Sequence, residues 1–104
     1  MKSLQQDYKN LEEAIVELKR KGYVEEFEIS KEGFLNIPLL DQKVLPKNAQ
    51  VTEFHRFESE TNPSSSVAVY AIQAQNGAKG LVFDETHDEQ RSSIAEFMTN
   101  VNPL

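Results

Sequence analysis

The chain has 104 residues, a formal net charge of −6 from 17 acidic and 11 basic residues, and no cysteine. This length fits one domain, residues 1–104, with a single core, and the acidic balance disfavours nucleic-acid binding because phosphate backbones attract basic surfaces. The lack of cysteine excludes disulfides, zinc–thiolate sites and thiol nucleophiles.

No segment has the character of a membrane span or a secretion signal. No apolar run approaches the roughly 20 residues that a helix needs to cross a bilayer. The N-terminus becomes polar at once and lacks the apolar stretch of a signal peptide. The sequence therefore predicts a cytoplasmic protein.

The first expected element is an amphipathic helix over residues 4–21. Its apolar residues recur at alternating spacings of four and three: Leu4, Tyr8, Leu11, Ile15 and Leu18. Ser3 and Gln6 form a capping-box pattern at its start, and Gly22 is a natural stop. Because one helix cannot bury its own apolar face, the pattern predicts a helix that lies on a sheet.

A short hairpin is expected next. Its strands are predicted over residues 23–30 and 34–37, with a turn at 31–33. Pro38 ends the pairing, because it has no N–H to donate to a neighbouring strand. Residues 39–50 are expected to form a connecting loop.

A third strand is expected over residues 51–58, although its alternation is imperfect. Phe54 and Phe57 fall on opposite faces under a strict period of two. A β-bulge near His55–Arg56 would account for this pattern, and so would a strand that is covered on both faces.

The strongest short-range signal in the chain is Asn76-Gly77 between two apolar runs. It predicts a β-hairpin with strands over residues 67–75 and 78–84. The first strand carries apolar residues on both faces: Val67, Val69 and Ala71 on one, and Ala68, Tyr70 and Ile72 on the other. Such a strand must be covered on both sides, so we expect it at the centre of the fold.

The length of the turn sets the register of this hairpin. With a two-residue turn, Ile72 opposes Leu81 and Tyr70 opposes Phe83. The second pair would be an aromatic contact across the hairpin that contributes about 0.2–1 kcal/mol.

A second helix is expected over residues 87–100. Thr86 and Glu89 form a capping-box pattern at its start, and Pro103 ends it. The order helix, five strands, helix predicts an α+β fold with an N-terminal helix, about five mostly antiparallel strands in one sheet, and a C-terminal helix.

Four residues are the candidates for a ligand-binding site: His55, Arg56, Tyr70 and Lys79. As a functional site, Arg56 would clamp an anion and His55 would act as an acid–base group. We favour the structural alternative, in which Arg56 pairs with Glu58 or a neighbouring carboxylate and His55 lies at a sheet edge, because no nucleophile lies within identifiable reach. No catalytic residue is predicted.

Three further segments resemble functional motifs, but a structural role accounts for each of them. Asp84–Asp88 concentrates potential metal ligands, but the run fits a strand exit and a helix cap, so neither a metal nor another cofactor is predicted. Ser64–Ser66 lies in a polar turn and lacks the Gly-x-Ser-x-Gly pattern. Gly77–Gly80 is too short for a phosphate-binding loop, and Gly80 indicates a bulge or a place where another side chain packs against bare backbone.

Five segments look like those of a known family: the helical opening that ends in Lys19–Tyr23, Phe54–Glu58, Asn62–Pro63, Val69–Ile72 and Gly77–Asp84. They resemble a family of small bacterial proteins, frequent in Bacteroidetes, that is often labelled phosphoribosylpyrophosphate synthetase. The label implies a ligand related to phosphoribosyl pyrophosphate. We carry over no catalytic residue, because this chain has no nucleotide-binding loop and the acidic run after its last strand would repel pyrophosphate unless Mg²⁺ ions intervened.

The leading hypothesis is a cytoplasmic binding protein without catalytic activity that self-associates as a homodimer. If both helices pack on one face of the sheet, the other apolar face of the 67–75 strand needs a partner. The alternative is an enzyme or sensor for a small phosphorylated ligand, which requires Arg56, Lys79 and His55 to line one pocket. A third hypothesis is an adaptor that accepts a partner's strand at an exposed sheet edge, expected at residues 24–37.

Overall fold

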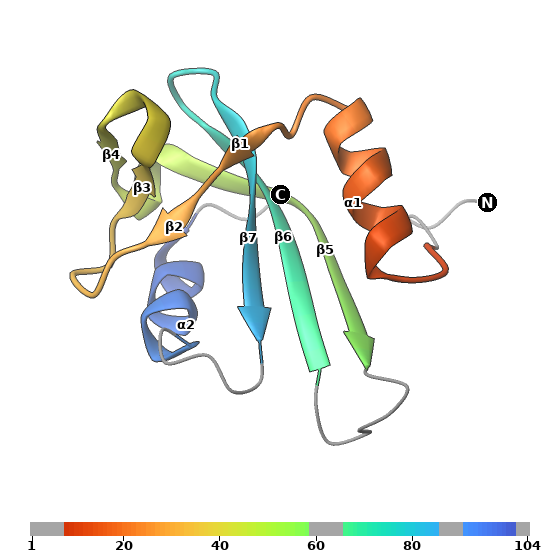
Figure 1. The fold of residues 1–104 in the computed structure, drawn as a ribbon. Coiled ribbons are helices and arrows are strands. Elements are labelled where there is room, and N and C mark those ends of the chain that lie inside the picture. Colours follow the sequence, from red (N-terminus) through yellow and green to blue (C-terminus); the bar gives the residue numbers. More distant parts are fainter. Residues whose placement is uncertain (1–7, 59–65, 86–90, 102–104) are drawn as a thin grey trace.

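The computed structural model of the protein describes residues 8–58, 66–85 and 91–101 (Figure 1). In chain order its helices and strands are α1 (Leu11–Arg20), β1 (Glu25–Glu26), β2 (Glu28–Ile29), β3 (Leu35–Ile37), β4 (Gln42–Val44), β5 (Ala49–Glu58), β6 (Ser66–Ala74), β7 (Lys79–Glu85) and α2 (Arg91–Asn100). Two short 3₁₀ helices flank β4: η1 (Pro38–Leu40) and η2 (Pro46–Asn48). The helix predicted over 87–100 is therefore present from Arg91, while its predicted cap at 86–89 and its stop at Pro103 lie outside the described residues.

The strands form two sheets, which corrects the prediction of a single sheet. The main sheet has the strand order β1-β7-β6-β5, and a small antiparallel sheet has the order β2-β3-β4. In the main sheet β5, β6 and β7 are antiparallel, whereas β1 pairs with β7 in parallel. The predicted α+β class is confirmed: one helix precedes the strands along the chain, one follows them, and the strands are mostly antiparallel.

The two sheets arise because the strand predicted over 23–30 divides at Phe27. Its first half, β1, joins β7, and its second half, β2, joins β3. Gly80 permits the pairing of β1 with β7, since a Cβ atom at this position would lie 2.5 Å from the carbonyl oxygen of Glu25. The close approach expected at Gly80 is present, but the group that approaches most closely is the backbone carbonyl of Glu25 and not a side chain.

The segment 39–50, predicted as a loop, contains β4 and the first residues of β5. Pro38 and Pro46 each open a 3₁₀ turn, where a missing N–H costs nothing because the first N–H groups of a helix have no partner. The prediction failed because the two prolines begin turns at either end of a short strand and do not exclude the strand between them.

α1 begins later than predicted, at Leu11. The side chain of Asn10 caps the helix by accepting a hydrogen bond from the N–H of Glu13 at 2.8 Å. The predicted Ser3–Gln6 capping box lies outside the described residues. The predicted stop at Gly22 is confirmed, because this residue follows the C-cap with φ of 104°.

The β6–β7 hairpin is confirmed, but its register differs from the prediction by one residue. The loop has three residues, Gln75–Gly77, and the N–H of Ala74 bonds to the carbonyl of Ala78 at 2.8 Å. Gly77 adopts φ of 96°, the left-handed conformation that closes a three-residue hairpin loop. Ile72 consequently opposes Gly80, not Leu81 as predicted.

The same shift removes the predicted Tyr70–Phe83 pair. Tyr70 opposes Val82, and Phe83 opposes Val69 on the other face of the sheet. The aromatic partner of Tyr70 is Phe54 of β5, whose ring centroid lies 4.9 Å away.

The irregularity in β5 is also displaced from its predicted position. The register shifts between Val51 and Glu53, so the bulge predicted near His55–Arg56 is wrong. Phe54 and Phe57 remain on opposite faces, and each packs against an apolar neighbour there. The second explanation of the imperfect alternation, a strand covered on both faces, holds in part, because both aromatic residues have apolar neighbours but only Ala49 and His55 of β5 are buried.

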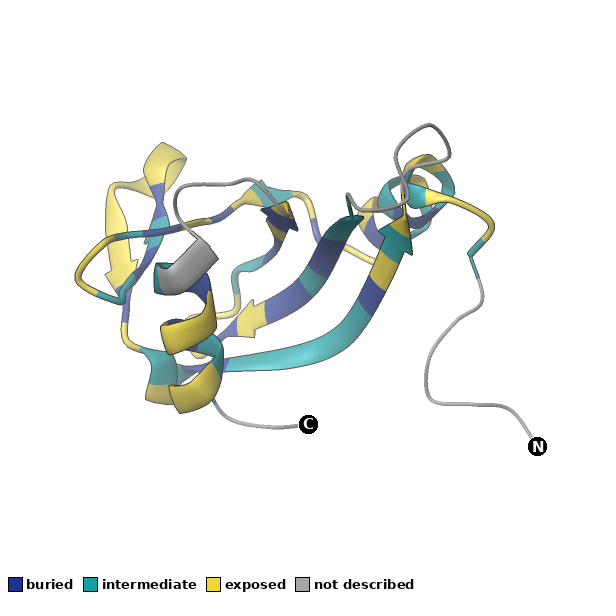
Figure 2. Cartoon of the chain, turned by 90° about the horizontal axis from the view of Figure 1, so that it is seen from below, coloured by how far each residue is buried: buried dark blue, intermediate teal, exposed yellow. Residues whose placement is uncertain are grey.

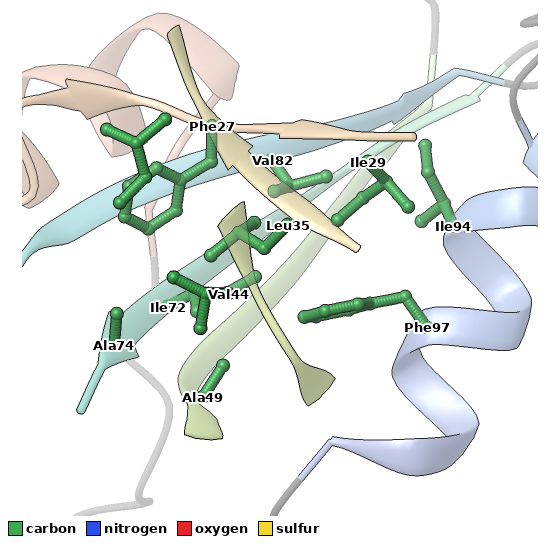
Figure 3. Packing of buried hydrophobic residues seen from close by; sticks show 11 residues of the cluster. Phe27, Ile29, Leu35, Val44, Ala49, Ile72, Ala74, Val82, Ile94 and Phe97 are labelled. Carbon is green, nitrogen blue, oxygen red and sulfur yellow. The ribbon is translucent and has the colours of Figure 1, made fainter. Parts of the chain in front are cut away.

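The buried residues, dark blue in Figure 2, include two apolar clusters on opposite faces of the main sheet, and Figure 3 shows the larger one. The larger lies between the α2 face of the main sheet, the small sheet and α2: Phe27, Ile29, Leu35, Ile37, Val44, Ala49, Ile72, Ala74, Val82, Ile94 and Phe97. The smaller lies between α1 and the other, α1 face: Leu18, Tyr23, Val69, Ala71 and Leu81. β6 contributes to both clusters, so the predicted central strand covered on both sides is confirmed. The two helices lie on opposite faces, however, so the condition under which one face would need a partner is not met.

Candidate functional site

The four candidate residues fall on two faces of the main sheet. Residues that oppose one another on antiparallel strands share a face. The register therefore places His55 and Lys79 on the α1 face and Arg56 and Tyr70 on the α2 face. The sheet separates Arg56 from His55 and Lys79, so these described residues do not line one pocket.

On the α1 face, four side chains form a polar group, the His55 cluster (Tyr8, Lys21, Glu53 and His55). Glu53 is at its centre: its Oε1 lies 2.9 Å from His55 Nε2, and its Oε2 accepts a hydrogen bond from Lys21 Nζ at 2.9 Å. Lys21 Nζ also donates to the Tyr8 hydroxyl at 3.1 Å, and the Tyr8 ring meets the His55 ring edge-on with centroids 4.8 Å apart. Each side chain thus has partners inside the cluster.

The His55–Glu53 pair has the composition of an acid–base group with its orienting carboxylate, but not the required access. A carboxylate only accepts hydrogen bonds, so His55 Nε2 carries the proton. His55 is only 7% exposed, and the Tyr8 ring packs against it. The cluster therefore joins the two ends of the α1 segment to β5 and leaves little room for a substrate at the imidazole.

The carboxylate of Glu53 and the ammonium of Lys21 both have shifted pKa values. Partial burial acts to raise the pKa of Glu53, but the hydrogen bonds from His55 and Lys21 and the charge of Lys21 outweigh it, so this pKa lies below 4.5. Burial likewise acts to lower the pKa of Lys21, but its bonds to Glu53 and Tyr8 outweigh that effect and hold it above 10.5. Both groups are therefore held in their charged forms.

Glu53→Gln is expected to weaken the fold and to reduce its sensitivity to acid. The lowered pKa of Glu53 means that its contribution is complete above pH 4.5 and is lost as the pH falls through the folded-state pKa. We expect the free energy of unfolding at neutral pH to fall by about 1–3 kcal/mol, because a neutral amide pairs less well with the Lys21 ammonium and the His55 N–H. Urea denaturation across the acid range measures both effects.

Glu58→Gln is the matched control, since Glu58 lies on the same strand with an exposed side chain. It should change neutral stability by less than about 0.5 kcal/mol and leave the acid profile intact. Equal acid sensitivity of the wild type and Glu53→Gln would contradict this account of the cluster.

Lys79 is also engaged within the fold. Its Nζ donates to the backbone carbonyl of Lys21 at 3.1 Å and lies 4.6 Å from the centroid of the Tyr23 ring. These contacts fix the ammonium beside the end of α1, where it interacts with a carbonyl and an aromatic face.

On the α2 face, Arg56 is exposed and its Nη1 donates to Ser66 Oγ at 3.1 Å. Its guanidinium carbon also lies 5.9 Å from the centroid of the Phe54 ring. Among the described ion pairs none joins Arg56 to Glu58, so that expected contact is replaced by Ser66. The prediction that His55 lies on an edge strand is confirmed, although its side chain is buried.

Two cavities on the described surface lie away from all four candidates. One, of about 400 Å³, lies between β4 and the β6–β7 loop and is lined by Gln42, Lys43, Val44, Asn48, Gln75 and Asn76. Another, of about 410 Å³, lies between α2 and η2, and its apolar lining is Phe34, Leu45, Pro46 and Phe97. Neither brings a titratable candidate to a concave surface.

Within the described ranges, no three His, Asp or Glu side chains are grouped so that they could hold a metal ion. His87 and Asp88, which belong to the acidic run considered for a metal, lie outside those ranges. The helices in this part of the chain are too short or too polar to cross a membrane.

Comparison with known proteins assigns no family to the chain. No protein-family model, curated protein or solved structure matches it. The resemblance to the small bacterial family labelled phosphoribosylpyrophosphate synthetase therefore stays a prediction.

Sequence reasoning missed three of the four members of the His55 cluster: Tyr8, Lys21 and Glu53. Tyr8 fits the apolar pattern of the first helix, and Lys21 fits a helix end, so neither indicates a polar group. Glu53 was the one detectable member, because residues two apart on a strand share a face and Glu53 precedes His55 by two.

Proposed function

We propose that this protein is a cytoplasmic, non-catalytic binding domain that self-associates as a homodimer. The observation that carries the proposal is the outer edge of the main sheet. β5 has ten residues and pairs with β6 on one side, and in the described chain no strand pairs with its other side. An exposed strand edge presents backbone N–H and C=O groups that favour pairing with another strand.

The other strand edges of the described chain offer fewer backbone groups for pairing than β5 does. β1 has only two residues, and the edge expected at residues 24–37 is interrupted because β1 and β2 join different sheets. The edge of β5 is thus the longest one available among the described strands. The candidate acid–base group, His55, is buried and bonded to Glu53, which supports binding over catalysis.

Sedimentation equilibrium tests self-association directly. We expect an average mass that rises with concentration from monomer to dimer, because pairing at one edge per chain closes after two copies. A strict monomer into the high micromolar range would contradict the proposal.

The phosphorylated-ligand alternative has its own test, a thermal-shift comparison with phosphoribosyl pyrophosphate, ATP and Mg²⁺. We expect no change in melting temperature, because Arg56 lies on the opposite face of the sheet from His55 and Lys79. A stabilisation that Arg56→Ala abolishes would support a ligand site and count against the binding domain proposed here. Glu58→Ala, on the same strand, is the matched control.

A further inference from the structure

We propose that two copies of this chain pair through β5 in antiparallel fashion about His55, so that Phe54 of each copy lies opposite Arg56 of the other. This inference rests on the self-association proposed above and names its surface and register. It follows from the direction of the backbone groups along β5, from the bulge, and from the charges of the outward-facing residues.

The hydrogen bonds at the start of the β6–β7 loop determine which residues of β5 direct their backbone N–H and C=O groups away from the main sheet. The N–H of Ala74 bonds to Ala78, towards β7, and the N–H of Gln75 bonds to Asn48, towards β5. Because successive residues of a strand direct their backbone groups to alternate sides, the odd-numbered residues of β6 face β5. Val69 is one of them.

His55 opposes Val69, so its backbone groups bond to β6. Its neighbours Phe54 and Arg56 must then direct their N–H and C=O groups away from the sheet. Figure 1 shows β5 as the last strand of the main sheet on that side. These outward groups are the hydrogen-bonding positions that a second copy would meet.

Symmetry leaves three central registers for two such strands. A twofold axis perpendicular to the sheet keeps each face continuous, so the outward residues pair as Phe54–Phe54, Arg56–Arg56 or Phe54–Arg56. The first register sets Arg56 against the irregular ladder at Thr52. The second places two guanidinium groups opposite each other, which is unfavourable. Phe54–Arg56 avoids the guanidinium pair and repeats on either side of the axis. It sets Thr52 opposite Glu58, so the irregular residue falls at the end of the ladder and not inside it.

The side chains of this register are complementary. Within one copy the Arg56 guanidinium already lies near the Phe54 ring, and Arg56 is exposed. Across the axis the same cation and aromatic ring would meet twice on the α2 face, a favourable contact for a guanidinium. The pattern is self-complementary, which is why a second copy of this chain fits the edge better than an unrelated strand.

Arg56→Pro tests the edge, because it removes an outward N–H that the single chain does not use in its sheet. Proline is tolerated at such edge positions. Arg56→Ala is the matched control, since it removes the guanidinium but keeps the N–H. In sedimentation equilibrium we expect Arg56→Pro to weaken dimerisation by about tenfold or more, and Arg56→Ala to weaken it less. Circular dichroism checks that both variants fold.

Cysteine pairing tests the register independently, because the chain has no cysteine of its own. Phe54→Cys and Arg56→Cys are oxidised separately and as a mixture. Opposed residues on paired strands have Cβ atoms about 4.5–5.5 Å apart, close to the distance that a disulfide spans. We expect a disulfide-linked heterodimer from the mixture and much less linkage from either variant alone.

The outcomes separate this inference from the proposed function. A wild-type dimer that Arg56→Pro leaves intact overturns pairing through β5 while self-association stands. A monomeric wild type overturns both. If Arg56→Pro fails to fold, the cysteine mixture decides, and the lack of a mixed disulfide in a dimeric protein overturns the register.

Discussion

Phe97→Ala is expected to lower the free energy of unfolding by about 3–5 kcal/mol. Phe97 is fully buried in the larger cluster, where α2 meets the small sheet and the α2 face of the main sheet (Figure 3). Its neighbours belong to separate elements held by their own hydrogen bonds, so they cannot close the cavity that alanine would leave. Urea denaturation followed by circular dichroism measures the loss.

Glu96→Ala is the control on the same helix, because Glu96 is exposed. Its effect should stay within about 0.5 kcal/mol. A loss of less than about 1 kcal/mol for Phe97→Ala would mean that α2 does not cover this face of the sheet.

Leu18→Ala is expected to cost about 2–5 kcal/mol. Leu18 is fully buried and anchors α1 to Val69, Ala71 and Leu81 on the other face of the sheet. Leu18 is the buried residue that α1 contributes to this cluster, and Leu11 packs against it as a partly buried neighbour. Fluorescence of the tyrosines during urea denaturation follows the loss.

Val16→Ala provides the comparison for Leu18→Ala, because Val16 lies on the same helix and is 50% exposed. We expect a change below about 0.5 kcal/mol. Equal effects of the two substitutions would show that α1 does not pack on the sheet through Leu18.

The elements with strong local signals could be predicted from the sequence. The helical pattern around Leu11, Ile15 and Leu18, the stop at Gly22 and the hairpin at Asn76-Gly77 all depend on residues close in the chain. The two apolar faces of the 67–75 strand also indicated a central position, which the two clusters confirm.

The arrangement of the strands could not be predicted, because it depends on distant contacts. The division of 23–30 at Phe27 follows from the pairing of β1 with β7, more than fifty residues away. The hairpin register depended on whether the loop had two or three residues, and Asn76-Gly77 is compatible with either. A change of one residue there moves Phe83 to the other face of the sheet.

The His55 cluster was hidden for a similar reason. Tyr8, Lys21 and His55 come from three segments, and only the packing of α1 against β5 brings them to Glu53. The candidate site residues chosen by their chemistry lie on two faces of the sheet. Successive residues of a strand point to opposite faces, so the adjacent His55 and Arg56 cannot share one.

Amide hydrogen exchange at β5, followed by NMR over a range of protein concentrations, tests the central claim most directly. The backbone directions predict that the His55 amide is protected at every concentration, because it bonds to β6, and that exchange at the Phe54 and Arg56 amides slows as the concentration rises. Fast exchange at Phe54 and Arg56 that is the same at all concentrations would contradict pairing of two copies through this edge.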